Sequence, residues 1–211
     1  MAGVEHKASL ALKSNKTRIK MDGLLQPLRL NEGNGLRNGI VFPLTPTIQV
    51  SHSANYGTYD VAGSIAQQNY YMNTPNASLS VTAMFASNTV AEALYTAAAL
   101  QFFKTCTKSD FGSSNMETAG TPPPILSFNC YGTLHAKNVP VVLRSFTYTL
   151  PEDTDYVTVE VDGESISVPT LVLVSIELSP QLTPSKVKSK FNITSFASGR
   201  LLNGGNTGGF I

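Results

Sequence analysis

The sequence predicts a mainly β protein, an antiparallel β-sandwich or split barrel with one packed α-helix and extended arms at both ends. Several segments alternate apolar and polar side chains with a period of two, as half-buried strands do. One long segment, residues 89–107, has helical composition, and an Asp-Gly turn at residues 162–163 joins two alternating runs. Strands that follow one another through hairpin turns favour an antiparallel sheet on which the helix packs.

Three parts follow one another along the chain of 211 residues. Residues 1–38 show no sustained periodicity and hold seven basic against three acidic side chains, which predicts an extended basic N-terminal arm. Residues 39–180 carry the alternating runs and the helix, and form the expected β domain. Residues 181–211 are polar, basic and rich in glycine, which predicts an extended C-terminal tail. We expect both ends to order only on contact with neighbouring proteins.

The first strand of the β domain comes after two closely spaced prolines. One face of this half-buried strand is formed by alternate residues, namely Ile48, Val50, His52, Ala54 and Tyr56. Further strands are predicted at residues 78–86, 125–131, 139–150, 156–161, 165–168 and 170–178. The last of these begins with four apolar residues that face both sides of a sheet, which predicts a central strand.

The predicted helix begins with a capping box. Thr89 and Glu92 have the Thr-x-x-Glu spacing in which each side chain binds the other residue's backbone amide. The helix body is rich in alanine and apolar around most of its circumference, so we expect cover on more than one side. Because a small sheet covers only one side, a neighbouring subunit is the expected second cover. The residues expected to face that subunit are Val90, Leu94, Ala98 and Phe102.

Charge is scarce and unevenly distributed. Hydrophobic residues make up 42% of the chain and charged residues 14%, whereas a typical soluble domain has about 25% charged residues. Serine, threonine and asparagine, at 21, 21 and 15 residues, replace the missing charge. The net charge of +1 argues against a protein that grips DNA, because phosphate neutralisation requires many basic side chains. Six acids lie within residues 152–164, whereas residues 178–211 hold four bases and no acid.

Cysteine content and hydropathy indicate the cellular setting. Cys106 and Cys130 are too few for a disulfide framework or a four-ligand zinc site, so we expect two reduced, buried thiols. No apolar run near the N-terminus is long enough for the core of a signal peptide, and no stretch is long enough for a membrane span. The expectation is a soluble intracellular protein.

The sequence offers no convincing active site. His6, His52 and His135 lack a second ligand at metal-binding spacing, and hydrolase, protease and phosphate-binding motifs are absent. The glycines at residues 33–39 have neither the spacing nor the following helix of a dinucleotide-binding loop. The acids of residues 152–164 are expected at a strand start and a hairpin tip, where water solvates them. We therefore expect no enzyme, no cofactor and no metal.

Five short phrases, taken in order, resemble one family. They are VFPLTPTI at residues 41–48, SHSANY at 51–56, GTPPPIL at 120–126, NVPVV at 138–142 and LPEDTDYV at 150–157. With the glycine-rich, aromatic C-terminus, they strongly resemble the baseplate tail-tube junction proteins of contractile-tailed bacteriophages, the tail tube initiator or tube cap family. The resemblance covers residues 39–211. Typical members are longer, and the roles of their additional segments are not implied for this chain.

The resemblance implies a structural virion protein. Such proteins have the tail-tube type of β fold and assemble as homohexamers whose inner strands join into one β-barrel around the DNA channel. The ring lies between the baseplate hub, or a second junction protein, and the first ring of tail tube protein. It initiates tube assembly, and in some members it also seeds the tail sheath. The implied location is the virion tail baseplate, reached from the host cytoplasm, and DNA passes through the lumen without specific binding.

Within such a ring, one face of the predicted hairpin is the candidate channel lining. Thr158, Glu160 and Asp162 share this face, and an acidic lining repels phosphate. The alternative is that the face meets the neighbouring ring. Two other functions stay open: a carbohydrate-binding β-sandwich, against which the absence of tryptophan counts, and a tail-tube or tube-terminator protein. A baseplate hydrolase would need a carboxylate pair or nucleophile that the sequence does not show.

Overall fold

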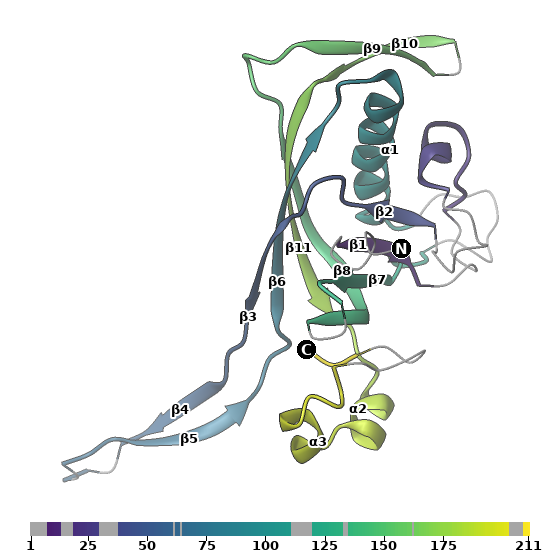
Figure 1. The fold of residues 1–211 in the computed structure, drawn as a ribbon. Coiled ribbons are helices and arrows are strands. Elements are labelled where there is room, and N and C mark those ends of the chain that lie inside the picture. The colour runs from purple at the N-terminus through teal and green to yellow at the C-terminus, as the bar shows by residue number, and fades with distance from the viewer. Residues whose placement is uncertain are drawn as a thin grey trace.

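Strand β11 (Leu171–Pro180) lies at the centre of the molecule, as Figure 1 shows. It pairs antiparallel with β6 (Ser78–Ala86) on one side and with β8 (Ala136–Thr149) on the other. The complete sheet has seven antiparallel strands in the order β2-β1-β7-β8-β11-β6-β3, and the described residues form no closed barrel. The predictions of a mainly β protein and of a central strand at residues 170–178 are confirmed.

The computed structural model describes residues 8–13, 19–29, 38–60, 62–63, 65–110, 120–132, 135–161, 163–202 and 209–211. The other strands are β1 (Ser9–Leu12), β2 (Gly39–Val41), β3 (Thr47–Ser51), β4 (Asn55–Tyr59), β5 (Gln68–Asn73), β7 (Leu126–Cys130), β9 (Tyr156–Val161) and β10 (Glu164–Pro169). The helices are the 3-10 helix η1 (Gly23–Leu28), α1 (Val90–Cys106), α2 (Pro184–Lys190) and α3 (Ile193–Ala197). β4 with β5, and β9 with β10, form two separate hairpins.

Helix α1 covers one face of the main sheet (Figure 1). Its start is the predicted capping box: the Glu92 amide donates to the Thr89 hydroxyl at 3.3 Å, and the Thr89 amide donates to the Glu92 carboxylate at 3.1 Å. Phe102 and Phe103 are fully buried between helix and sheet. The Phe103 ring stacks on Phe146 of β8 with their centroids 5.0 Å apart. The capped helix therefore closes the main hydrophobic core.

The second cover of α1 comes from the same chain. The β9–β10 hairpin folds over the helix, where Ala93, Val159 and Val168 form a small buried cluster. The 3-10 helix η1 packs along another side of α1 and buries Leu25 and Leu28 in the main core. Most of the apolar circumference is therefore covered within one molecule, while Ala91, Gln101 and Lys104 stay exposed.

The expected subunit-facing residues of α1 need correction for this reason. Ala98 and Phe102 are fully buried in the core of their own chain, so they cannot face a neighbouring subunit. Leu94 is partly buried against the β9–β10 hairpin. Val90, which is 55% exposed, is open to contact with another molecule.

The N-terminal segment is not simply an arm. Ser9–Leu12 forms strand β1, which pairs with β2 on one side and β7 on the other, and Leu10 is fully buried. The prediction of an extended arm over residues 1–38 is wrong here because the apolar side chains of β1 and η1 complete the core. Residues 1–7, 14–18 and 30–37 of the predicted arm lie outside the described part of the chain.

The C-terminal segment is likewise folded. Helices α2 and α3 lie at the end of the molecule opposite the β9–β10 hairpin (Figure 1), so the prediction of an extended tail is wrong for residues 184–197. Residues 203–208 of the predicted tail lie outside the described part of the chain. The Phe191 ring lies 5.7 Å from both Phe196 and Phe210, which gives the segment a small aromatic core. The Gly209 amide donates to the Lys137 carbonyl oxygen of β8 at 3.2 Å. We call residues 184–202 and 209–211 the C-terminal module.

Phe102→Ala should lower the free energy of unfolding by about 3–5 kcal/mol, because it leaves a cavity between helix and sheet. Val90→Ala, at the exposed end of the same helix, should change it by less than about 0.5 kcal/mol. Urea unfolding of the free protein measures both. Equally small effects of the two substitutions would show that Phe102 is not part of the monomer's core.

Candidate assembly interface

The face of the main sheet opposite α1 is open and almost uncharged. In the register of β3, β6, β11 and β8, one row across this face is Thr47, Thr82, Ser175 and Thr147. The next row is Gln49, Ser80, Glu177 and Ser145. Glu177 is the one charged residue in these rows, and its carboxylate accepts a hydrogen bond from the Ser145 hydroxyl at 3.3 Å. We call these two rows the hydroxyl face.

The hydroxyl face ends at two unpaired strand edges. β3 pairs with β6, and no other described strand pairs with it. β7 pairs with β8 only as far as Val141, and a bulge near Arg144 separates this part from the rest of β8. Residues 145–149 of β8 therefore pair with β11 alone among the described strands. Unpaired edges offer rows of amide and carbonyl groups to another chain.

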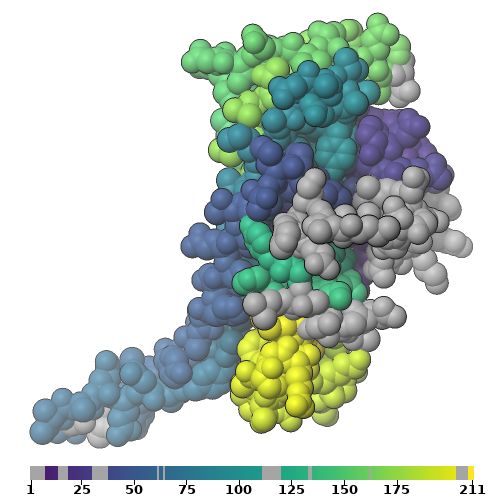
Figure 2. All heavy atoms as spheres, in the orientation of Figure 1, coloured from purple at the N-terminus to yellow at the C-terminus, as the bar shows by residue number. Residues whose placement is uncertain are grey.

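The β4–β5 hairpin projects from the body of the molecule, as Figure 2 shows. Strand β3 ends at Ser51 and β4 begins at Asn55, so the predicted half-buried strand through Tyr56 is two strands, and Tyr56 is exposed. Every residue of β5 is exposed. The large exposed side chains, each between 53% and 61% accessible, are Tyr56, Tyr59, Tyr70, Tyr71 and Met72. An exposed apolar patch of this kind marks an interaction surface.

Two of the three predicted channel-lining residues, Thr158 and Glu160, lie on β9. Thr158 and Glu160 are exposed on the outer face of the β9–β10 hairpin, while Val159 between them is buried towards α1. Register places Ser167 opposite Thr158 and Ser165 opposite Glu160 on the same outer face. Asp162 lies outside the described residues. The structure thus places two of the three residues on one exposed surface, at the end of the sheet away from the C-terminal module (Figure 1).

The C-terminal module is basic. It carries Lys186, Lys188, Lys190 and Arg200, and no acidic side chain. Burial, together with the charges of Lys13 and Lys190, lowers the pKa of Lys186. The Lys186 ammonium lies 5.1 Å from the centre of the Phe210 ring, an arrangement in which an aromatic face attracts a cation. Clustered positive charge and exposed apolar side chains make this module a second interaction surface.

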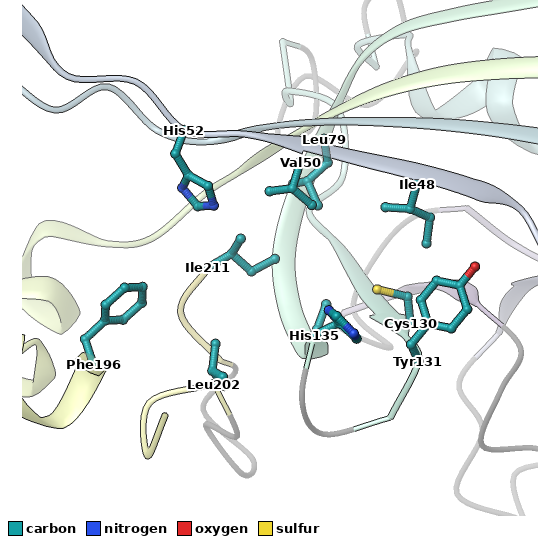
Figure 3. A pocket seen from close by; sticks show the side chains of 11 residues that line it. Ile48, Val50, His52, Leu79, Cys130, Tyr131, His135, Phe196, Leu202 and Ile211 are labelled. Atoms are coloured by element: carbon teal, nitrogen blue, oxygen red, sulfur yellow. The ribbon is translucent and has the colours of Figure 1, made fainter. Parts of the chain in front are cut away.

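An apolar cavity of about 460 Å³ lies between β3 and the C-terminal module (Figure 3). His52 and His135 line it at separate points, and Ile211 lies between them. A second cavity of about 640 Å³ lies beside η1 and the end of α1, lined in part by Leu25 and Thr105. Cys130 also lines the first cavity, but burial raises the pKa of this thiol to about 11, so it stays protonated and is a poor nucleophile for the two histidines to activate.

Cys106 and Cys130 are both buried, and they form no disulfide. Burial raises the pKa of Cys106 to about 12. Burial also raises the pKa of Cys130 to about 11, partly offset by a hydrogen bond with the backbone of Ala136. Both thiols therefore stay protonated near neutral pH, which makes them poor nucleophiles and poor metal ligands.

Comparison with models of known protein families and with curated proteins finds no match. None of the helices in the described ranges is both long and apolar enough to cross a membrane. Over the same ranges, no three His, Cys, Asp or Glu side chains gather as ligands for a metal ion.

Sequence reasoning missed both the hydroxyl face and the β4–β5 hairpin as candidate surfaces. The alternation of hydroxyl and apolar residues in β6 and β11 was a usable signal for the first. For the second, the signal was a run rich in tyrosine and asparagine in which Asp60 is the one Asp, Glu, Lys or Arg between residues 47 and 77. Which surfaces stay open, however, depends on where other elements pack.

The native protein should react only slowly with a soluble aromatic disulfide reagent at about pH 8, because both thiolates are scarce and buried. Denaturant should expose both thiols to rapid reaction. The absorbance of the released aromatic thiolate counts the reacted cysteines. Rapid reaction of one cysteine in the native protein would contradict the burial of that side chain.

Proposed function

We propose that this chain forms a homohexameric ring at the junction between baseplate and tail tube, where it initiates assembly of the tail tube protein around the DNA channel. The observation that carries the proposal is the hydroxyl face with its two unpaired edges. A monomer leaves both edges open to unspecific pairing, whereas a closed ring pairs all of them. The five phrases that resemble tail-tube junction proteins support the same role.

Strand directions are compatible with such a ring. β3, β6, β11 and β8 are four consecutive antiparallel strands, so the two edge strands run in opposite directions. When the β3 edge of one copy lies beside the β8 edge of the next, the alternation of directions continues unbroken. Contacts of this head-to-tail kind produce a ring when the rotation between copies closes. The four-stranded units then form one barrel, as the tail-tube type of fold requires.

The hydroxyl face suits the wall of a DNA channel. Its two rows present hydroxyl and amide groups, one carboxylate from Glu177 and no basic side chain. The exposed Arg144 in the adjoining β8 bulge is the nearest cation along the strand, and the rows themselves offer phosphate none, which favours DNA that slides past without being bound. The outer face of β9, with Thr158 and Glu160, lies at one end of this barrel. There it flanks the channel mouth or meets the neighbouring ring, and Asp162 stays a prediction.

The remaining surfaces of the ring face its partners. One end contacts the hub or a second junction protein, and the other contacts the first ring of tail tube protein. Contact with the sheath is part of the same proposal, because the helical side of each copy lies outside the barrel. The site of action is the baseplate of the virion tail, and assembly takes place in the host cytoplasm.

A carbohydrate-binding module is the rival from another class. The exposed tyrosines of the β4–β5 hairpin favour it, because flat aromatic rings stack on sugar rings. A tail-tube protein is the nearer rival, because it would form the same kind of ring. It differs from a junction protein in that its rings stack on one another to build the tube. Assembly experiments separate the three possibilities.

The purified chain, added to the tail tube protein of the same phage, should shorten the lag before tubes grow, because a preformed ring replaces the slow first nucleus. Light scattering follows the lag, and electron microscopy of gold-labelled chain should show the label at one tube end. Heat-unfolded chain is the control. Label along the whole tube identifies a tail-tube protein, and binding of oligosaccharides with no effect on the lag identifies the carbohydrate-binding rival.

Like charges placed on both edges should prevent ring formation. Gln49→Lys with Thr147→Lys puts two cations on the meeting edges of neighbouring copies, whereas Gln49→Lys with Thr147→Glu puts opposite charges there. Both positions are exposed, so both variants should fold alike. Sedimentation should show rings for the second variant and monomers for the first, with salt reducing the difference. Equal assembly of the two variants would contradict pairing of these edges.

A further inference from the structure

Two exposed apolar surfaces lie at the same end of the molecule. One is the β4–β5 hairpin, with Tyr59, Tyr70 and Met72 among its exposed side chains. The other is the C-terminal module, where Ile193 is 68% exposed and Val187 and Phe191 are also open to solvent. In Figure 1 the hairpin extends away from the module. The two surfaces therefore cannot cover each other within one chain, although both expose apolar side chains to water.

The hairpin gains little support from its own chain. Among the described residues from 52 to 76, none belongs to either hydrophobic core or packs against one. Its order comes from local contacts. The Tyr56 and Tyr71 rings meet edge to face with their centroids 5.9 Å apart. The side-chain amide of Asn55 donates to the side-chain oxygen of Asn73 at 2.8 Å. An isolated two-stranded hairpin is at best marginally stable in water. A partner that covers this hairpin therefore also stabilises it.

Both faces of the hairpin carry aromatic side chains. Pairing places Tyr56 opposite Tyr71 on one face, and Gly57 opposite Tyr70 on the other. A side chain at Gly57 would lie 2.5 Å from the Tyr70 ring, so the glycine leaves room for that ring to lie flat across the strand. Each face of the hairpin therefore presents tyrosine to solvent, and tyrosine is among the residues that contribute most to protein interfaces.

The two surfaces complement each other in charge. Asp60 is the one Asp, Glu, Lys or Arg residue between residues 47 and 77, whereas the C-terminal module holds four basic side chains and no acidic one. Aromatic faces attract cations, and this chain already uses the contact twice, with Lys186 over Phe210 and Lys104 over Tyr148. Exposed tyrosines on the hairpin therefore match a surface that combines Lys188 and Arg200 with exposed apolar side chains.

We propose that the β4–β5 hairpin of one copy docks on the C-terminal module of the next copy around the ring. The proposal rests on the ring proposed above. The hairpin continues from β3 and β6, and β3 is the edge that meets the neighbour, so the hairpin contact is continuous with the edge contact. The module follows directly from β11 and is tied to β8 at Lys137, in the part of β8 before the free edge of residues 145–149 that meets the other neighbour. Each copy thus holds one neighbour with its hairpin and is held by the other through its module.

Crosslinking tests the contact in the full chain. Tyr70→Cys and Ile193→Cys, combined in one chain, place one reactive thiol on each surface, while Cys106 and Cys130 stay protected by burial. A short bismaleimide should then link successive copies into a ladder that ends at six. The matched control combines Ile193→Cys with Ser165→Cys, an exposed position on the outer face of the β9–β10 hairpin at the far end of the molecule, and should give no ladder.

A second experiment measures how much the hairpin side chains contribute to the affinity of ring association. Tyr59→Ser, Tyr70→Ser and Met72→Ser together should weaken ring association roughly thirtyfold or more, because an interface loses its central aromatic contacts. Circular dichroism and thermal unfolding of the monomer should stay unchanged, since these side chains lie outside both cores. Tyr156→Ser, which removes an equally exposed tyrosine from β9, is the matched control and should have a much smaller effect.

The outcomes separate the two proposals. A six-step ladder with the selective loss of association supports hairpin docking. Rings of the expected mass without a ladder, or equal weakening by the hairpin and Tyr156 variants, overturn the docking and leave the ring intact. A chain that stays monomeric at high concentration and beside tail tube protein overturns both.

Discussion

The burial of helix α1 on one face of the seven-stranded sheet is the interaction on which the rest of the structure depends. Phe102 and Phe103 fill the space between helix and sheet, and each fully buried side chain of this size contributes about 2–3 kcal/mol. Because α1, the long helix of the described ranges, covers that face, the opposite face of β3, β6, β11 and β8 is left without a helix among the described elements. An open face has to be compatible with water, and here hydroxyl rows meet that need.

The same helix ties together segments that are distant in sequence. The Tyr95 hydroxyl donates to the Val41 carbonyl oxygen at 2.7 Å and accepts from the Val41 amide at 2.8 Å, which joins the helix to β2 at the far edge of the sheet. Burial raises the pKa of Tyr95, so the neutral hydroxyl needed for both bonds is retained. With the β9–β10 hairpin on another side, the helix is largely covered within the monomer, and the sheet edges and projecting elements are the surfaces available for the proposed assembly.

The surfaces that stay uncovered in the single molecule have one property in common. Free strand edges at β3 and residues 145–149, the tyrosine hairpin and the exposed side chains of the C-terminal module each cost free energy in a lone molecule. Head-to-tail contact covers all of them at once, because the hairpin and the β3 edge lie on one side of each copy. The proposed junction ring and the proposed docking of its hairpins both follow from the need to cover these exposed edges and side chains.

The sequence by itself determined the class of fold, the capped helix and the central strand, because periodicity and Thr89 with Glu92 are local signals. It predicted a neighbouring subunit as the cover of Ala98 and Phe102, which is wrong, because a period of hydrophobicity does not say what covers a side chain. Only the tertiary structure decided that the cover is intramolecular. It likewise decided that Ser9–Leu12 joins the sheet beside β7, more than a hundred residues away, and that the hydroxyl face stays open. Those outcomes depend on packing between distant segments, which no local pattern contains.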